Sequence, residues 1–368
     1  MGRTSMDNTS MDKKSSKLGF TLLEMMVAMA LGLIVMSAMA SLFKMGMNST
    51  LTVTQRAETQ SNMRASIDIM AKDISLAGAG LPTGGIQLPA GTGSSASKYA
   101  CDAGSCHLPV NTYPGGNYMY GIIPGYNNGV EASASIPAAT SLINDSITVI
   151  YADYNFPLWE FNLNFTSATS GAAVTVAANG SFSPAPPAIT SAGGIQVGDL
   201  IMVQGGGITA VGEVTALTNT SMAFANLDPL NINQDGAQSG NLKAIAAAVG
   251  TGTPVTAYRL FAITYYLTVP GAGQTPRLMR QVNGLTPVPV ADDIINLQFA
   301  YDVYDSTNSA LDANQANPLG VSEIPNNIQK VNMLVMAQSI LNTGKKSQNM
   351  YLATSVSARN MTFRNRYQ

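Results

Sequence analysis

The chain has 368 residues, which is enough for one large domain or two smaller ones with a sizeable core. Only 11 % of its residues are charged, against about 25 % in ordinary soluble domains, and its formal net charge is −2. This balance excludes nucleic-acid binding through a broad basic surface. The single histidine, His107, also excludes the H-E-x-x-H motif and most zinc-binding sets.

The first predicted element is a membrane-spanning helix. The apolar run from Phe20 to Phe43 carries one charged residue, Glu24. As a helix it would span about 36 Å, which is enough for a hydrocarbon core of about 30 Å. Basic residues precede it, and the positive-inside rule therefore places this end in the cytoplasm and the C-terminal bulk outside. These basic residues are Arg3, Lys13, Lys14 and Lys17.

Glu24 distinguishes the kinds of membrane segment that fit this run. A carboxylate at the centre of a membrane helix costs about 2.5–3.5 kcal/mol, and less near the interface. A plain signal anchor leaves the charge unexplained unless its side chain reaches the headgroups. A cleaved secretory signal also leaves it unexplained, although the basic start and the small-x-small pattern of Ala38-Met39-Ala40 support that alternative.

Residues 17–24, KLGFTLLE, resemble the processing site of type IV prepilins. In that family a prepilin peptidase cuts after the glycine and N-methylates the new first residue. The resemblance implies cleavage between Gly19 and Phe20, loss of a leader of residues 1–19, and N-methylation of Phe20. It also assigns Glu24 to docking onto a neighbouring subunit during assembly. Pairing of the carboxylate with a cationic α-amine would offset the burial of both charges.

The predicted helix continues past the membrane. No proline occurs between Phe20 and Leu81, and apolar residues recur there at helical spacings of three and four. We therefore expect one helix from Phe20 to about Ala77, within an N-terminal region of residues 20–80, whose second half packs on a head domain. The apolar stripe consists of Met63, Ile67, Met70, Ile74 and Ala77, and the stop signals are Gly78, Gly80 and Pro82.

The region 81–145 is rich in Gly, Ser and Pro, and we expect a loop-rich connection with little regular structure. Cys101 and Cys106 form an even pair that encloses four residues. Outside the cytoplasm such a pair favours a disulfide, which would be a small local staple. The spacing is not C-x-x-C, and we do not expect a redox role.

From residue 146 to 368 the sequence predicts a β-rich head. Runs that are β-branched or alternate between apolar and polar residues lie between turn residues. These runs are SITVIYA, GDLIMVQGG, ITAVGEVTAL, RLFAITYYLTV, RLMRQVNG, IINLQFAYDVY, VNMLVMAQSI and YLATSVSARN. The fold class is therefore α+β, with a long transmembrane and amphipathic helix packed on an antiparallel sheet. Residues from about 158 to 250 indicate an inserted β-rich subdomain.

Pieces spread over most of the mature chain resemble the PilW family of minor pilins, which is related to the J-type pseudopilins of type II secretion. The pieces occur here in the order of that family, at residues 67–78, 144–153, 197–204, 277–284, 291–303, 328–339 and 354–360. The resemblance implies a structural protein, not an enzyme, that takes part in priming assembly of a type IV pilus. Capping of the pilus tip is a further role that it leaves open.

That resemblance also implies partners and a location. The partners are the prepilin peptidase, other minor pilins, the major pilin, the inner-membrane assembly platform and inner-membrane lipid. The location is the inner membrane, with one span and a periplasmic head, and after assembly the pilus at the cell surface. Adhesion and motility are functions of such pili. Two alternatives stay open: a J-type pseudopilin, and an exported binding protein or enzyme with a Sec signal.

Motifs for catalysis and cofactors are weak. We find no G-x-S-x-G elbow, and Cys106 beside His107 is a poor nucleophile pair. Asn231-x-Asn233-x-Asp235-Gly236 copies the start of an EF-hand loop, but Leu242 stands where a glutamate is required. We therefore expect no cofactor, with calcium as the remaining candidate. Its weak ligand candidates lie around the loop after the predicted strand 294–304, and they are Asp302, Asp305, Asn308 and Asp312.

The C-terminal tail mixes basic and aromatic residues, a combination that can bind single-stranded nucleic acid. The residues concerned are Arg359, Phe363, Arg364, Arg366 and Tyr367. A short basic tail is more typical of a solvated strand end or a contact with phospholipid. We therefore do not expect nucleic acid to be a partner.

Overall fold

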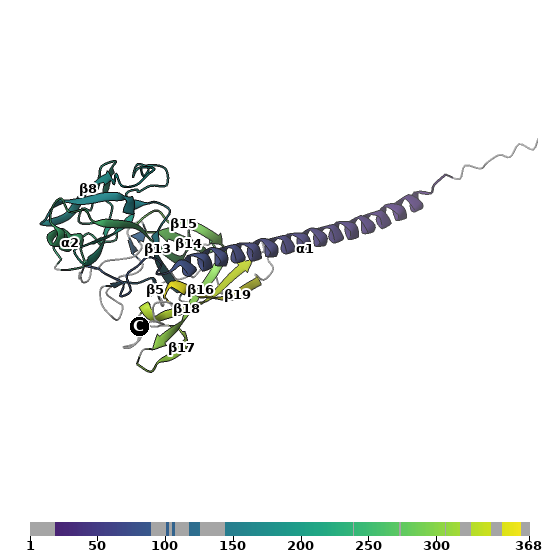
Figure 1. Ribbon diagram of the computed structural model, residues 1–368. Coiled ribbons are helices and arrows are strands. Elements are labelled where there is room, and N and C mark those ends of the chain that lie inside the picture. The colour runs from purple at the N-terminus through teal and green to yellow at the C-terminus, as the bar shows by residue number, and fades with distance from the viewer. Residues whose placement is uncertain are drawn as a thin grey trace, which may run out of the picture. The chain divides into compact units, whose positions relative to one another are not determined.

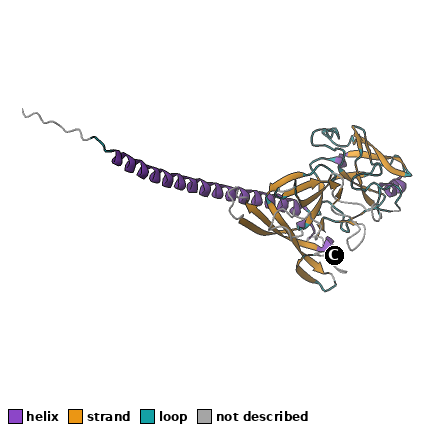
Figure 2. Ribbon diagram, turned by 180° about the vertical axis from the view of Figure 1, so that it is seen from behind, coloured by secondary structure: helices purple, strands orange, loops and turns teal. Residues whose placement is uncertain are grey.

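The structure is a computed structural model, and its chain divides into two compact units, Met1–Thr54 and Gln55–Gln368. Figure 1 labels the elements, and Figure 2 shows the helices in purple and the strands in orange. The residues that the structure describes are 19–89, 101–102, 105–106, 118–125, 144–237, 239–271, 274–305, 307–316, 325–339 and 348–361.

Helix α1 runs from Leu22 to Leu76 and has 55 residues. This confirms the predicted helix within two residues at its start and one at its end. The helix ends where Gly78 and Gly80 adopt φ angles of 76° and 72°, a left-handed conformation that glycine takes without a steric penalty. All five residues of the predicted apolar stripe are buried in the second unit. The amphipathic half of the helix therefore packs on the head as expected.

The largest sheet of the head has seven antiparallel strands in the order β10-β9-β13-β14-β15, with β6 on the other side of β13 and β5 beside β6. Its strands are β5 (Ile122–Gly125), β6 (Ser146–Asp153), β9 (Leu200–Gly205), β10 (Ile208–Glu213), β13 (Thr256–Thr268), β14 (Arg277–Val282) and β15 (Val288–Asp292). β9 and β10 form a hairpin in which Gly205 pairs with Ile208. Gly206 and Gly207 both have positive φ, as a two-residue hairpin turn requires.

A second sheet of four antiparallel strands has the order β17-β16-β18-β19. These strands are β16 (Ile294–Asp305), β17 (Ala310–Gln315), β18 (Ile328–Ser339) and β19 (Gln348–Ser357). One apolar core joins this sheet, the end of the seven-stranded sheet and the buried stripe of α1. Met70 and Ile74 of the helix, Tyr265 of β13 and Val335 of β18 all belong to this core and are almost inaccessible to solvent. The α+β fold class is thus confirmed.

The region from about 158 to 250, predicted as an insertion, contributes to two different sheets. Its own sheet has the order β11-β12-β8-β7. That sheet and helix α2 (Leu242–Val249) surround a separate apolar core. The four strands are β7 (Phe161–Ser167), β8 (Ser170–Ala178), β11 (Ala216–Thr218) and β12 (Ser221–Ala223). The hairpin β9–β10 lies within the same region but belongs to the seven-stranded sheet.

The described parts of region 81–145 hold short strands and one four-residue strand. The short strands are β1 (Ile86–Gln87), β2 (Cys101–Asp102), β3 (Ser105–Cys106) and β4 (Tyr118–Met119). β1 pairs with β4, and the four-residue β5 pairs with β6. The described part of the head also contains short 3-10 helices at Leu158–Glu160 and Pro325–Asn327.

Candidate processing and membrane-anchor site

The predicted cleavage bond lies outside the helix. Gly19 and Phe20 precede the first helical residue, Leu22, and both are exposed. The exposed fraction of Phe20 is 85 %. Exposed non-helical backbone is the kind of segment that a peptidase can bind, because its amide groups are not engaged in a helix. The bond between Gly19 and Phe20 is therefore exposed and lies in non-helical backbone, and cleavage there stays a prediction.

Glu24 closes a capping box at the start of α1. The backbone N–H of Thr21 donates to Glu24 Oε2 at 3.0 Å, and the Thr21 hydroxyl donates to the same oxygen at 3.1 Å. In return, the backbone N–H of Glu24 donates to Thr21 Oγ1 at 3.2 Å. A threonine at the N-cap with a glutamate three residues later satisfies helix N–H groups that otherwise lack a partner. Glu24 thus has a structural role within its own chain.

The box leaves one oxygen of the carboxylate available. Both bonds from Thr21 go to Oε2, and within the described residues Oε1 of Glu24 accepts none. A cation from outside the chain can therefore approach Oε1 without breaking the cap. Sequence reasoning singled out Glu24 but missed Thr21. The signal was present, because T-x-x-E before an apolar run is the sequence signature of a capping box.

The first half of α1 has the properties of a membrane anchor. Its most apolar window of 18 residues has a mean hydropathy of 2.2, and none of that window is buried inside the chain. The helix has the length and composition to cross a membrane. The Ser37 hydroxyl donates to the Ile34 carbonyl at 2.8 Å, so this polar group is satisfied within the helix. At Gly32 and Gly46 no atom lies within 4 Å of the position that a Cβ atom would take. Packing within the chain therefore does not require glycine there.

A buried polar cluster fixes the head half of α1 to the sheet. Asp73 lies on the apolar stripe and is 5 % exposed. Its Oδ2 accepts hydrogen bonds from the Tyr265 hydroxyl at 2.6 Å and from Arg280 Nε at 2.9 Å. The Tyr151 hydroxyl donates to Oδ1 at 3.4 Å. Burial, together with the nearby Asp73 charge, raises the pKa of both tyrosines, which keeps them protonated as donors.

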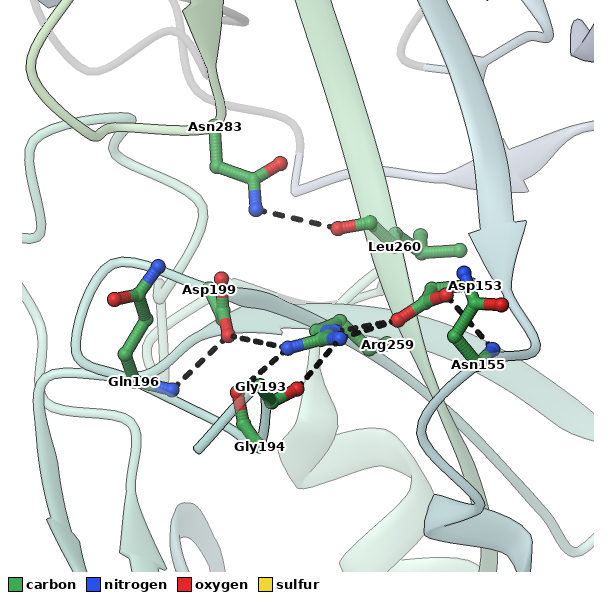
Figure 3. Close-up of polar contacts among 9 residues, drawn as sticks. All are labelled: Asp153, Asn155, Gly193, Gly194, Gln196, Asp199, Arg259, Leu260 and Asn283. Atoms are coloured by element: carbon green, nitrogen blue, oxygen red, sulfur yellow. Dashed lines mark hydrogen bonds and ion pairs between the residues drawn. The ribbon is translucent and has the colours of Figure 1, made fainter. Parts of the chain in front are cut away.

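A second buried cluster surrounds Arg259 of β13 (Figure 3). Its guanidinium donates from Nε and Nη2 to Asp153 Oδ2, the first at 2.8 Å. It also donates to the carbonyls of Gly194 at 2.6 Å and Gly193 at 3.1 Å, and Nη1 lies 3.6 Å from Asp199 Oδ2. Burial raises the pKa of Asp199. These contacts join β13 to the end of β6 and to the loop before β9. Carboxylates and carbonyls of the chain itself engage all three nitrogens of the guanidinium, so the cluster has a structural role in the fold.

The weak calcium candidates lie on the β16–β17 hairpin, three of them in its strands and one in the turn between them. Asp302 and Asp305 are on β16 and Asp312 is on β17, while Asn308 is in the turn. Protein donors occupy the first two: Lys330 Nζ lies 2.8 Å from Asp302 Oδ2, and the Thr307 N–H donates to Asp305 Oδ1 at 2.7 Å. Burial raises the pKa of Asp302, but the hydrogen bonds from Lys330 and its neighbours outweigh it and the net pKa is lowered.

The segment that copies the start of an EF-hand also uses its oxygens within the fold. Asn233 Oδ1 accepts from the Glu213 N–H at 2.9 Å. Asp235 accepts from the Ser170 hydroxyl at 2.8 Å and the Gly171 N–H at 3.0 Å. Within the described residues, no group of three or more His, Cys, Asp or Glu side chains could hold a metal ion.

The predicted disulfide involves residues whose backbone alone is described. β2 and β3 pair antiparallel with Cys101 directly opposite Cys106. Residues opposed in this way have Cα atoms about 4.5–5.5 Å apart, which lies within the range of disulfides. The register therefore permits the bond, which stays a prediction. His107 and the tail from Thr362 lie outside the described residues.

Comparison with known proteins identifies the N-terminal segment. The family model described as the prokaryotic N-terminal methylation motif matches residues 14–40. No curated protein and no solved structure matches the chain. The chain therefore carries a type IV prepilin-like motif, which includes Gly19, Phe20 and Glu24 and ends within α1. Such a motif implies processing by a prepilin peptidase and association with pilus components, and with the apolar helix it fits a membrane-anchored protein.

Proposed function

We propose that this chain, whose N-terminal motif is that of type IV prepilins, matures into a minor pilin of the PilW family. It primes assembly of a type IV pilus together with other minor pilins, and it caps the tip. The observation that carries the proposal is the exposed Gly19–Phe20 bond followed by Glu24 at the start of a 55-residue helix. The ordered PilW-like pieces along the head support the choice of subfamily.

The two halves of α1 suit the two states of a pilin. Before assembly the apolar half lies in the inner membrane, and the head lies in the periplasm and is held by the apolar stripe and Asp73. After assembly the same apolar surface packs against helices of neighbouring subunits. The large head would crowd a filament wall if it were repeated along it, so a few copies at the tip fit better than a main subunit. A high stoichiometry along purified filaments would contradict this assignment.

In the proposed mechanism Glu24 acts between subunits. Cleavage leaves a cationic N-methylated amine on Phe20 of each subunit. The amine of an incoming subunit pairs with the carboxylate of its neighbour, through the oxygen that the capping box leaves open. In low dielectric this pairing offsets the burial of both charges. The partners are thus other pilins, reached through the membrane, and the assembly platform that inserts them.

The first test is mass spectrometry of the N-terminal peptide of the protein extracted from membranes. An N-methylated Phe20 is the expected result. A mature chain that starts at Ser41 would mean a cleaved secretory signal, and the proposal would be wrong. Deletion of the gene distinguishes a minor pilin from a J-type pseudopilin. We expect the deletion to abolish pili, whereas deletion of a J-type pseudopilin would abolish protein secretion.

The capping box allows a sharper test of Glu24. Glu24→Gln retains an amide oxygen for the cap but removes the charge, whereas Thr21→Ala removes the cap and retains the charge. We expect Glu24→Gln to be processed but not incorporated into pili, and Thr21→Ala to be incorporated. If Thr21→Ala abolishes incorporation and Glu24→Gln does not, Glu24 acts only as a helix cap and the docking role is refuted.

A further inference from the structure

Most sheet edges of the described head are protected against pairing with another strand. The unpaired part of β6 is covered, because Gly78 N–H donates to the Ile150 carbonyl and Ala152 N–H donates to the Ala79 carbonyl, each at 2.8 Å. The edge of β7 receives a bond from Val255 N–H to the Leu163 carbonyl, also at 2.8 Å. These bonds use backbone groups that would otherwise face an incoming strand.

Three further edges, those of β10, β15 and β17, are blocked by other means. The Asn233 side chain bonds both the N–H and the carbonyl of Glu213 on β10. β15 contains Pro289, which has no N–H, and it pairs with β14 through a bulge. β17 has six residues and a bulge against β16. Proline, bulges and short length are the usual ways in which proteins blunt an edge.

Strand β19 has none of these protections. It runs from Gln348 to Ser357, contains neither proline nor a charged residue, and pairs with β18 over all ten residues without a bulge. Among the described residues no strand pairs with its other edge. The side chains of Met350, Leu352 and Val356 pack against the main core but are only half-buried. A long, regular, uncharged edge of this kind can accept a further strand.

Two features beside this edge fit a partner. Tyr351 has an exposed fraction of 72 %, and tyrosine is among the residues enriched at the energetic centres of interfaces. A shallow groove of about 520 Å³ crosses the outer face of the same sheet. Its lining includes Leu334, Ala353 and Ser355, and Leu334 pairs directly with Ala353. The edge therefore offers backbone groups, and the groove beside it offers room for a side chain.

We propose that β19 accepts an extended strand from a different pilin-like subunit, which extends the four-stranded sheet by a fifth strand. This inference rests on the proposed function, which supplies such subunits as partners. The strand would carry no charge, since neither β19 nor its half-buried row offers one to pair with. Its inward-facing residues would be apolar and would complete the cover over Met350, Leu352 and Val356. Backbone bonds would supply affinity and the alternating side chains would supply specificity.

Photo-crosslinking of the full chain in cells that make pili tests this inference. p-Benzoylphenylalanine is placed at Tyr351, and as a control at Leu311 of β17, which is also exposed (52 %). We expect a product at position 351 that joins this chain to a different pilin-like subunit, with mass spectrometry placing the bond in an extended segment of it. A product between two copies of this chain, or no product, would overturn the inference.

A second variant tests pairing through the edge itself. Thr354→Lys places a charge in the middle of β19, and Leu311→Lys places one on the other edge of the same sheet. We expect Thr354→Lys to reduce the cross-link from position 351 about tenfold or more and Leu311→Lys to leave it unchanged. Equal yields in the two variants would overturn the inference. Methylation of Phe20 is measured in the same samples, so a failed cross-link with a methylated Phe20 refutes only the role of β19.

Discussion

Removal of the buried carboxylate of Asp73 should weaken the attachment of α1 to the head. In Asp73→Ala the Tyr265 hydroxyl loses its 2.6 Å acceptor, and Tyr265 is fully buried. Arg280 loses its 2.9 Å partner, but 29 % of its side chain is exposed. Breaking a buried pair by removing one partner costs about 3–5 kcal/mol. Because Arg280 can turn towards water, we expect a loss of about 2–4 kcal/mol in the free energy of unfolding.

Two further variants show how much of this loss in unfolding free energy comes from one hydrogen bond and how much any substitution on the helix would cause. Tyr265→Phe removes the hydroxyl and leaves the ion pair between Asp73 and Arg280, so we expect about 1–2 kcal/mol, in the range of one hydrogen bond to a charged group. Asp68→Ala is the matched control, because Asp68 lies on the exposed side of the same helix. A surface substitution of this kind should stay within about 0.5 kcal/mol of the parent.

Urea unfolding of the full chain in detergent provides the measurement. Trp159, the only tryptophan of the chain, reports on the head, where its ring stacks on that of Tyr258 at 5.9 Å. For Asp73→Ala we expect a lower urea concentration at the midpoint of unfolding. The slope of the unfolding free energy against urea concentration should stay unchanged, which indicates that only stability has changed. If Asp73→Ala and Asp68→Ala have the same midpoint, Asp73 gives no net stabilisation, and the cluster is not what holds the helix.

Three further predictions concern the head. The pKa of Glu213 is raised to about 9 from its ordinary 4.5 by burial and then by Asp228, so the folded protein holds a proton that the unfolded chain releases. The free energy of unfolding should therefore fall as pH rises between about 4.5 and 9, by up to roughly 1.4 kcal/mol per pH unit. In Glu213→Gln the urea midpoint should depend less on pH over this range. Arg259→Met leaves buried carboxylates unpaired and should cost about 3–5 kcal/mol, whereas Arg277→Met, at an exposed ion pair, should cost under about 1 kcal/mol in the same urea assay. If Cys101 and Cys106 are bonded, the intact mass should rise by two hydrogens on reduction, and an unchanged mass would contradict the disulfide.

Much of the fold follows from local patterns in the sequence. The stripe from Met63 to Ala77 predicted which face of the helix is buried, because helical spacing alone decides that face. The eight predicted strand runs all contain observed strands, since alternation and turn residues are local signals. Strands β7 and β8 were missed, although the FNLNF run at Phe161–Phe165 alternates strictly and its three apolar residues are buried.

Pairing between distant strands could not be predicted in the same way. Residues 158–250 form a compositional block, which led to the prediction of an insertion. Yet β9 pairs with β13, outside that block, and β9 and β10 therefore belong to the seven-stranded sheet. The partners of a strand depend on long-range packing, to which its own sequence is only one contributor.

The candidate site was easier to predict than the polar clusters of the head. Gly19, Phe20 and Glu24 lie within eight consecutive residues, so a motif could reveal them together. Asp73 was also within reach, because its spacing of three from Met70 and four from Ala77 puts it on the buried stripe. Its partners Tyr265 and Arg280 come from two strands far along the chain, and no local pattern joins them to the helix.

A carboxylate in the middle of an apolar stripe determines how the helix lies on the sheet. The stripe contains Met63 and Met70, and methionine adapts to many neighbours. An apolar contact of this kind tolerates a slide of one helical turn, about 5.4 Å, because apolar residues would still face the core. Such a slide would carry Asp73 away from a hydroxyl at 2.6 Å and leave its charge buried without a partner. Asp73 therefore selects one register of α1 on the head. In that register the helix stripe shares one apolar core with the four-stranded sheet, which has β19 at its edge.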